Sequence, residues 1–251
     1  MDPASLSTVA TASGDPTPLL WAVLPTGAYL IGSFPTAHLI ARSRGVDLGS
    51  VGSKSYGATN LGRTLGRTYG IACFLIDAAK GAVPVLVAGW LLGTLGAAPV
   101  DVSILATWCW LAVAAAAIVG HTLSPWIGFK GGKGVATGFG ALAAMAPAMT
   151  LPTFQALAIW AALVVAFRMV SFASIAAAWS IPVAIAVRAL FDGGLDGVRA
   201  VGPYVIASLV IAVFITIKHR ANLARIRAGT ESKIKLGRSD GSAAAGGEPN
   251  P

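Results

Sequence analysis

The sequence predicts an all-α polytopic membrane protein with seven transmembrane helices. Of its 251 residues, 55% are hydrophobic and only 11% are charged, whereas soluble domains carry roughly 25% charged residues. The apolar residues also gather in long runs, and about 20 of them in a row are enough to cross a bilayer. These observations exclude an ordinary soluble enzyme, a disordered chain and a nucleic-acid-binding domain, although the formal net charge is +8.

Changes in composition divide the chain into a polar N-terminal tail (1–17), a membrane domain (18–235) and a C-terminal tail (236–251). The N-terminal tail holds acidic residues but no basic one, so no secretory signal is expected there. Small and polar residues dominate the C-terminal tail, which is therefore predicted to be disordered. Cys73 and Cys109 lie inside apolar runs, which does not support a disulfide framework.

Seven apolar runs give the predicted spans. They cover residues 18–40, 69–96, 102–127, 135–149, 151–167, 172–190 and 203–217. The fourth and fifth are predicted to form a hairpin of two short helices, because Pro147 and Pro152 flank the stretch between them and the residue before a proline avoids the helical conformation. A single kinked and tilted helix over 135–167 is the alternative, but it would be about 50 Å long and overshoot the bilayer.

Seven spans place fifteen of the eighteen basic residues on one side of the membrane. The exceptions are Arg188 and Arg199 on the other side, and Lys80 inside the second span. Because cytoplasmic loops carry the excess of Lys and Arg, the N-terminus is predicted outside and the C-terminus in the cytoplasm. Lys80 and Asp77 are three positions apart on one helix, so we expect them to pair; a functional role and a structural ion pair are both open.

The first of three unusually polar segments is the predicted cytoplasmic loop at 49–63. It packs Gly, Ser, Thr and Asn residues around Arg63. Such a loop can turn backbone N–H groups and hydroxyls toward an anion, while the arginine makes a bidentate phosphate contact. A solvated loop that carries a positive-inside arginine is the alternative.

The second segment, 120–137, places Lys133 among glycines immediately before an apolar helix. The glycines let the loop approach a ligand closely, and the helix N-terminus favours anions. The pattern is not a phosphate-binding Walker A loop, because Gly134 stands where that loop has Ser or Thr. An interfacial anchor with Trp126 at headgroup level is the alternative.

The third segment, 218–231, follows the last span. His219 and Asn222 share one face of a helix there, which indicates either a site or a basic helix drawn to anionic lipid. No cluster with metal-ligand spacing, nucleophile elbow or dinucleotide-binding glycine pattern occurs, so neither a metal nor a cofactor is expected.

Together, segments 52–63, 120–137 and 219–231 resemble, in this order, the three motifs of the bacterial acyl-phosphate:glycerol-3-phosphate acyltransferases, the PlsY family. The resemblance extends to 32–35 and 75–81 and covers nearly the whole chain apart from the tails. It implies transfer of a fatty acyl group from acyl phosphate to the 1-hydroxyl of sn-glycerol 3-phosphate, which yields lysophosphatidic acid for phospholipid synthesis. It also implies a multi-pass protein of the bacterial inner membrane, expected to be a monomer, whose active site faces the cytoplasm.

By motif position, the resemblance assigns three groups of site residues. Ser53, Thr59, Asn60 and Arg63 would line the substrate pocket; Gly131, Gly132, Lys133 and Gly134 would hold a phosphate; His219 and Asn222 would complete the catalytic site, with Glu231 structural. His219 is the general base by residue type, and a phosphate oxygen of the substrate is the alternative. The chain departs from the family at Lys54-Ser55, where relatives have Gly-Asn, and at Pro125, which is shifted by one position.

Two other classes of protein are alternatives to an acyltransferase. A small transporter or channel for an anionic metabolite would use the same basic loops, but it would also need charged or broken helices near the midplane and an internal repeat. Only Asp77 and Lys80 approach that requirement, and no repeat is visible in the sequence. The second rival is an inactive membrane scaffold derived from the family.

Overall fold

The computed structural model describes residues 14–234; the predicted disordered tail at 236–251 and most of the polar tail at 1–17 lie outside the described residues. The described part contains ten α-helices and two short 3₁₀ turns. No β-strand is present among the described residues, and an isolated bridge pairs Ser124 with Lys130. The prediction of an all-α fold is therefore confirmed for this part of the chain.

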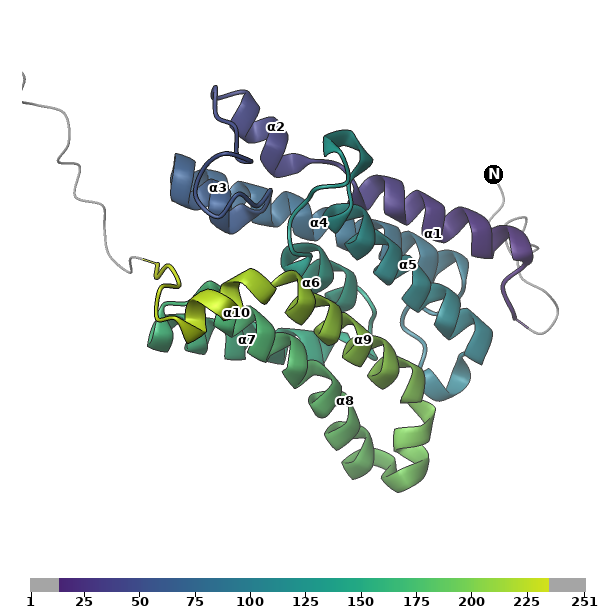
Figure 1. Ribbon diagram of the computed structural model, residues 1–251. Coiled ribbons are helices and arrows are strands. Elements are labelled where there is room, and N and C mark those ends of the chain that lie inside the picture. The colour runs from purple at the N-terminus through teal and green to yellow at the C-terminus, as the bar shows by residue number, and fades with distance from the viewer. Residues whose placement is uncertain (1–13, 235–251) are drawn as a thin grey trace, which may run out of the picture.

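The helices form two groups that meet at α6 (Figure 1). The N-terminal group consists of α1 (Pro18–Gly32), α2 (Thr36–Arg42), α3 (Ala58–Leu65), α4 (Arg67–Leu91) and α5 (Ile104–Thr122). The C-terminal group consists of α7 (Thr150–Phe167), α8 (Val170–Ala200), α9 (Gly202–Lys218) and α10 (Arg220–Arg227). Between them, α6 (Val135–Ala143) packs against α4, α5 and α7, and the 3₁₀ turns η3 (Pro99–Asp101) and η4 (Pro125–Ile127) lie in the loops on either side of α5.

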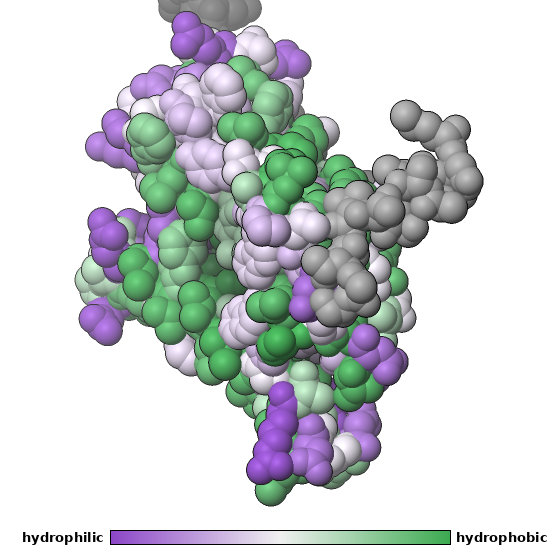
Figure 2. Space-filling view, turned by 90° about the vertical axis from the view of Figure 1, so that its right-hand side faces the viewer, coloured by the Kyte–Doolittle hydropathy of each residue, from purple (hydrophilic) through white to green (hydrophobic). Residues whose placement is uncertain are grey.

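Five helical segments in the described residues are long and apolar enough to cross a membrane: α1 with α2, then α4, α5, α7 and α8. A sixth arises if α9 and α10 are counted together across the 61° bend between them. Hydrophobic side chains cover much of the face shown in Figure 2, while hydrophilic ones gather toward its edges. This arrangement is that of a polytopic membrane protein, in which exposed apolar side chains can face lipid and exposed charges lie toward the edges.

The fourth predicted span differs from what the sequence suggested. Its helix, α6, ends at Ala143 after 9 residues and is therefore about 14 Å long, less than half of a hydrocarbon core about 30 Å thick. The predicted break before α7 is confirmed, because residues 144–149 separate the two helices. Pro147 lies in this break, where its ring and missing N–H prevent α6 from continuing.

Other helix ends also differ from the predicted span limits. α4 ends at Leu91 and α5 at Thr122, five residues before the predicted limits in both cases. α8 runs on to Ala200, ten residues beyond the predicted end, across a non-helical kink at Gly193 and Gly194. The backbone of Gly194 has φ 60° and ψ −146°, a conformation open essentially to glycine alone. This kink lets helical structure resume after the apolar run has ended.

Close helix contacts depend on glycines that face neighbouring backbones. A Cβ atom on Gly32 would collide with the backbone of Ala117, which joins α1 to α5, and one on Gly140 would collide with the backbone of Ala78, which joins α6 to α4. Lipid offers no hydrophobic drive for helices to associate, so small residues that permit close packing are the usual solution. The contacts hold α4, α5 and α6 together beneath the three polar segments.

Candidate active site

The three polar segments converge on one elongated cavity of about 180 Å³. Its polar lining includes Ser53, Thr59, Asn60, Arg63, Lys133, His219, Asn222 and Glu231. Its apolar lining comes mainly from α6 to α9 and includes Phe139, Leu142, Leu157, Trp160, Ile181 and Ile211. A cavity built in this way suits a ligand with a charged head and a hydrocarbon chain.

The loop before α3 is shaped by Asn60, which is only 1% exposed. Its Oδ1 accepts a hydrogen bond from the backbone N–H of Ser53 at 3.0 Å, and its Nδ2 donates to the carbonyls of Val51 at 3.2 Å and Ser55 at 3.1 Å. Gly52 has φ 58°, and a Cβ atom there would collide with Asn60 Oδ1. The amide of Asn60 is therefore engaged in holding the loop.

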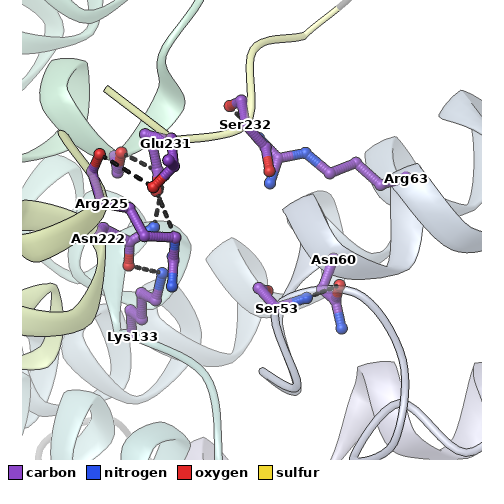
Figure 3. A network of polar contacts seen from close by, with 10 residues as sticks. Ser53, Asn60, Arg63, Lys133, Asn222, Arg225, Glu231 and Ser232 are labelled. Carbon is purple, nitrogen blue, oxygen red and sulfur yellow. Dashed lines mark hydrogen bonds and ion pairs between the residues drawn. The ribbon is translucent and has the colours of Figure 1, made fainter. Parts of the chain in front are cut away.

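Thr59 and Arg63 lie one turn apart on α3, and both are exposed. The guanidinium of Arg63 donates a hydrogen bond to the carbonyl of Ser232 at 3.0 Å (Figure 3). The backbone N–H of Ile234 in turn donates to the carbonyl of Arg168 at 2.8 Å. The segment after α10 thus joins α3 to the end of α7, and it gives Arg63 a neutral partner that an anionic ligand can replace.

Lys133 lies on the opposite wall, half-buried. Its Nζ donates a hydrogen bond to Asn222 Oδ1 at 2.5 Å. Burial lowers the pKa of Lys133 to about 8; Arg225 and Arg63 act in the same direction, and Glu231 opposes them. A half-buried ammonium beside two guanidinium groups is a strong attractor for an anion, because the anion would relieve the repulsion among them.

The glycines around Lys133 divide into two kinds. Gly134 lines the cavity and caps the N-terminus of α6 with φ 84°. Gly131 and Gly132 instead pack against His121. A Cβ atom on Gly131 would collide with the His121 carbonyl, and one on Gly132 with the His121 ring. These two glycines let the loop lie close to α5.

His219 stands at the bend between α9 and α10 and is only 3% exposed. Its Nδ1 lies 2.8 Å from the carbonyl oxygen of Ile215. Because a carbonyl can only accept, Nδ1 carries the proton, which leaves Nε2 unprotonated as a hydrogen-bond acceptor. The fold therefore fixes one tautomer of His219 in the cavity wall.

Glu231 connects the third segment to α8 (Figure 3). Its Oε1 accepts hydrogen bonds from Asn222 Nδ2 at 2.6 Å and Ser171 Oγ at 2.7 Å, and its Oε2 accepts one from Arg225 Nε at 2.8 Å. Burial alone would raise the pKa of Glu231, but the hydrogen bonds from Asn222, Ser171 and Arg225 outweigh it and lower the pKa. Asn222 thus bridges Lys133 to an ionised carboxylate, and the two contacts orient its amide, with Oδ1 toward Lys133 and Nδ2 toward Glu231.

Three further residues of this region were not assigned to the site by the motifs. Ser171 lies outside the three motifs, yet its hydroxyl donates a hydrogen bond to Glu231 Oε1. Asp77 and His121 line the cavity, and the histidine beside Gly120 in the second segment was the available signal. The predicted pairing of Asp77 with Lys80 is confirmed at 2.9 Å.

Comparison with known proteins places this geometry in a family. The family model described as glycerol-3-phosphate acyltransferase matches residues 22–229. Proteins named glycerol-3-phosphate acyltransferase from Geobacter sulfurreducens and Trichlorobacter lovleyi are each 42% identical to the chain, over 85% and 83% of it and over 97% and 95% of their own lengths. The crystal structure of PlsY (YgiH), an integral membrane glycerol 3-phosphate acyltransferase, in its glycerol 3-phosphate form, has a TM-score of 0.72 at 32% identity and covers 86% of this chain and 96% of its own. The chain belongs to the glycerol-3-phosphate acyltransferase family.

Proposed function

We propose that the protein transfers a fatty acyl group from acyl phosphate to the 1-hydroxyl of sn-glycerol 3-phosphate, producing lysophosphatidic acid and phosphate. The observation that carries this proposal is the amphiphilic cavity, which Arg63, Lys133 and His219 line together with apolar side chains of α6 to α9. Both substrates carry a phosphate, and one also carries a hydrocarbon chain. A soluble anionic metabolite would have no use for the apolar part of the cavity, which disfavours a transporter.

The chemistry needs positioning and charge more than a covalent nucleophile, because acyl phosphate already carries a good leaving group. The 1-hydroxyl oxygen attacks the acyl carbonyl carbon, and the carbon–oxygen bond to phosphate then breaks. Lys133 and Arg63 neutralise the phosphate charges. The hydroxyl proton passes either to His219 Nε2 or to a phosphate oxygen of the substrate.

Asn222 and Glu231 support this arrangement by holding Lys133 in place. Asn60 supports it differently, since the hydrogen bonds of its amide hold the loop that carries Ser53, directly before α3. Backbone N–H groups of the two loops are therefore better candidates than Asn60 for stabilising the negative charge that develops on the carbonyl oxygen.

We further propose seven passages through the bacterial inner membrane, with the N-terminus outside and both the active site and the C-terminus in the cytoplasm. The short α6 counts as a passage together with the turn that follows it, because Gly96 N–H, in the α4–α5 connection, donates to the Ala146 carbonyl at 3.0 Å. That connection lies at the opposite end of α4 from the cavity mouth. We also propose that the protein is a monomer.

Purified protein incubated with palmitoyl phosphate and glycerol 3-phosphate tests the reaction. Lysophosphatidic acid formed in equal amount to released phosphate is the expected result. Phosphate release without lysophosphatidic acid, or no turnover, would overturn the proposal and leave the inactive scaffold as the better description.

Labelling of intact cells with a membrane-impermeant maleimide tests the orientation. Cys73 and Cys109 are buried, so signal is expected only from introduced thiols. Asp196→Cys should react and Lys54→Cys should not; the reverse pattern would invert the proposed topology.

A further inference from the structure

A buried polar cluster lies directly behind the glycine loop, where α4 meets α5. Asp77 is 1% exposed, and Lys80 and His121 are each 7% exposed. Asp77 and Lys80 come from α4, and His121 comes from the end of α5. Three ionisable side chains buried together in a membrane protein are costly to maintain, so their arrangement needs a purpose.

Lys80 balances the charge of Asp77 and ties the pair to a third element. Its Nζ lies 2.9 Å from Asp77 Oδ1 and donates to the carbonyl of Phe34, after α1, at 2.7 Å. His121 Nδ1 lies 3.8 Å from the same Asp77 oxygen. The carboxylate therefore lies between Lys80 and the Nδ1 edge of the imidazole, and at 3.8 Å its contact with the ring is electrostatic rather than a hydrogen bond.

The opposite edge of the imidazole faces the loop that carries Lys133. A Cβ atom added to Gly132 would collide with His121 Nε2 and would come within 3.1 Å of the Tyr56 carbonyl. Gly132 is thus held between the His121 ring and the first polar loop. Its backbone φ lies outside the left-handed range, so this crowding, rather than conformation, accounts for glycine at this position.

His121 also has little freedom to act on a ligand itself. Its Nε2 edge is covered by Gly132, whereas His219 presents an acceptor nitrogen in the cavity wall. The position of His121 suits a support for the loop, one residue away from the ammonium that faces the ligand.

We infer that His121, oriented by Asp77, is a positioning residue that sets the place of Lys133 by packing its imidazole against Gly132. The inference rests on the proposed acyl transfer and names a residue other than Arg63, Lys133 and His219 that controls it. A misplacement of about 1 Å at a reacting group can cost roughly a hundredfold in rate, so a ring held between a carboxylate and a loop has a large effect through the position of Lys133 alone.

A double-mutant cycle on the full-length protein tests the contact. His121→Ala removes the support, and Gly132→Ala inserts a methyl group that the ring cannot accept; each is expected to raise the KM for glycerol 3-phosphate about tenfold or more. In the double variant the new methyl group occupies the space left by the ring. Its KM is therefore expected to fall well below the product of the two single effects, and below that of Gly132→Ala alone.

His121→Asn separates positioning from a purely structural role. The shorter side chain keeps an amide donor near Asp77 but removes the ring atoms that contact Gly132. We expect thermal stability close to wild type together with a raised KM. Gly27→Ala is the matched control, because a Cβ atom there meets nothing within 4 Å, and it should keep wild-type kinetics.

Several outcomes would contradict either this inference or the proposed function. Wild-type KM and kcat in His121→Ala, or single effects that simply multiply in the double variant, would overturn the inference while the acyl transfer stands. Full activity in His121→Asn would assign His121 to the ion cluster alone and would also overturn it. A wild-type protein without turnover would instead count against the proposed function, which distinguishes the two failures.

Discussion

The two ends of the molecule carry ion pairs of opposite kinds. At the cavity, the side chain of Glu231 is 3% exposed and bonds to Ser171, 60 positions away, as well as to α10. At the far end of α8, Arg188 pairs with Asp192 and Arg199 with Asp196, and these side chains are 57% to 89% exposed. One network joins separate elements, while the other pairs link neighbouring turns of a single stretch of chain.

The comparison teaches that position, not residue type, decides what these charges do. Exposed pairs contribute about 0 to 1 kcal/mol to stability, because water already solvates both partners. A buried carboxylate with three donors cannot lose its charge or a partner so cheaply. Glu231 should therefore contribute to stability and the cationic groups of the cavity to substrate use, whereas the charges at the far end should contribute to neither.

Removing the cationic groups of the cavity is expected to have the largest effect on activity, and it tests the difference between the two ends most directly. Arg63→Ala and Lys133→Ala are each expected to lower kcat/KM for glycerol 3-phosphate about a hundredfold, because each removes a preorganised charge from the phosphate. The rate of lysophosphatidic acid formation by purified variants measures this. Arg199→Ala, which removes an arginine from the far end, is the matched control.

Wild-type kinetics in both cavity variants would mean that neither side chain binds a substrate phosphate. A loss in only one would restrict that role to the affected residue. Yield and melting temperature in detergent must stay near wild type for either conclusion, since the proposed role concerns substrate and not folding.

The next largest effect is expected from Glu231→Gln, which keeps the size of the side chain but removes its charge. Arg225 and Asn222 then lose a charged acceptor, at a cost of about 2 kcal/mol in unfolding free energy. A lower melting temperature in detergent measures this. Asp192→Asn makes the same chemical change at the far end; an equal shift in both variants would contradict the distinction between the two ends.

A smaller effect should appear with pH. Lys133 has its pKa lowered to about 8, so its ammonium is present below that pH and is lost as the pH rises through it. The substrate phosphate has a second pKa near 6 and stays a dianion above pH 7.5. The KM for glycerol 3-phosphate should therefore rise about fivefold between pH 8 and pH 9.

Lys133→Arg tests whether Lys133 is the titrating group, because a guanidinium stays charged over the whole pH range. Its KM should be nearly flat between pH 8 and pH 9, even if its absolute value is higher. A rise as steep as that of the wild type would assign the pH dependence to another group.

Local contacts could be predicted from the sequence, but contacts between distant positions could not. The pairing of Asp77 with Lys80 and the break near Pro147 were predictable, because helix periodicity and proline geometry act over a few residues. The bond between Ser171 and Glu231 was not, since no local rule links positions so far apart. Likewise, the three motifs indicated a shared site, but only the folded chain reveals that Asn60 is occupied by its own loop.

The length of α6 also could not be predicted from local sequence. Apolar composition continues past Ala143, so the sequence predicted a longer span, but hydropathy alone does not fix where a helix stops. The turn at 144–149 also has to meet Gly96 in the α4–α5 connection, and this tertiary contact is compatible with an early end. Boundary errors of this kind are expected wherever packing, rather than composition, ends a helix.

The smallest expected effect belongs to the far end and completes the comparison. Arg188→Ala and Arg199→Ala each remove one partner of an exposed pair within α8, so the unfolding free energy should change by less than about 0.5 kcal/mol. Melting temperature in detergent and the rate of acyl transfer measure both consequences, and both should match the wild type. A loss of activity in either variant would mean that the two ends are coupled through α8, for example across the kink at Gly193 and Gly194. The charges at the far end would then belong to the working part of the molecule.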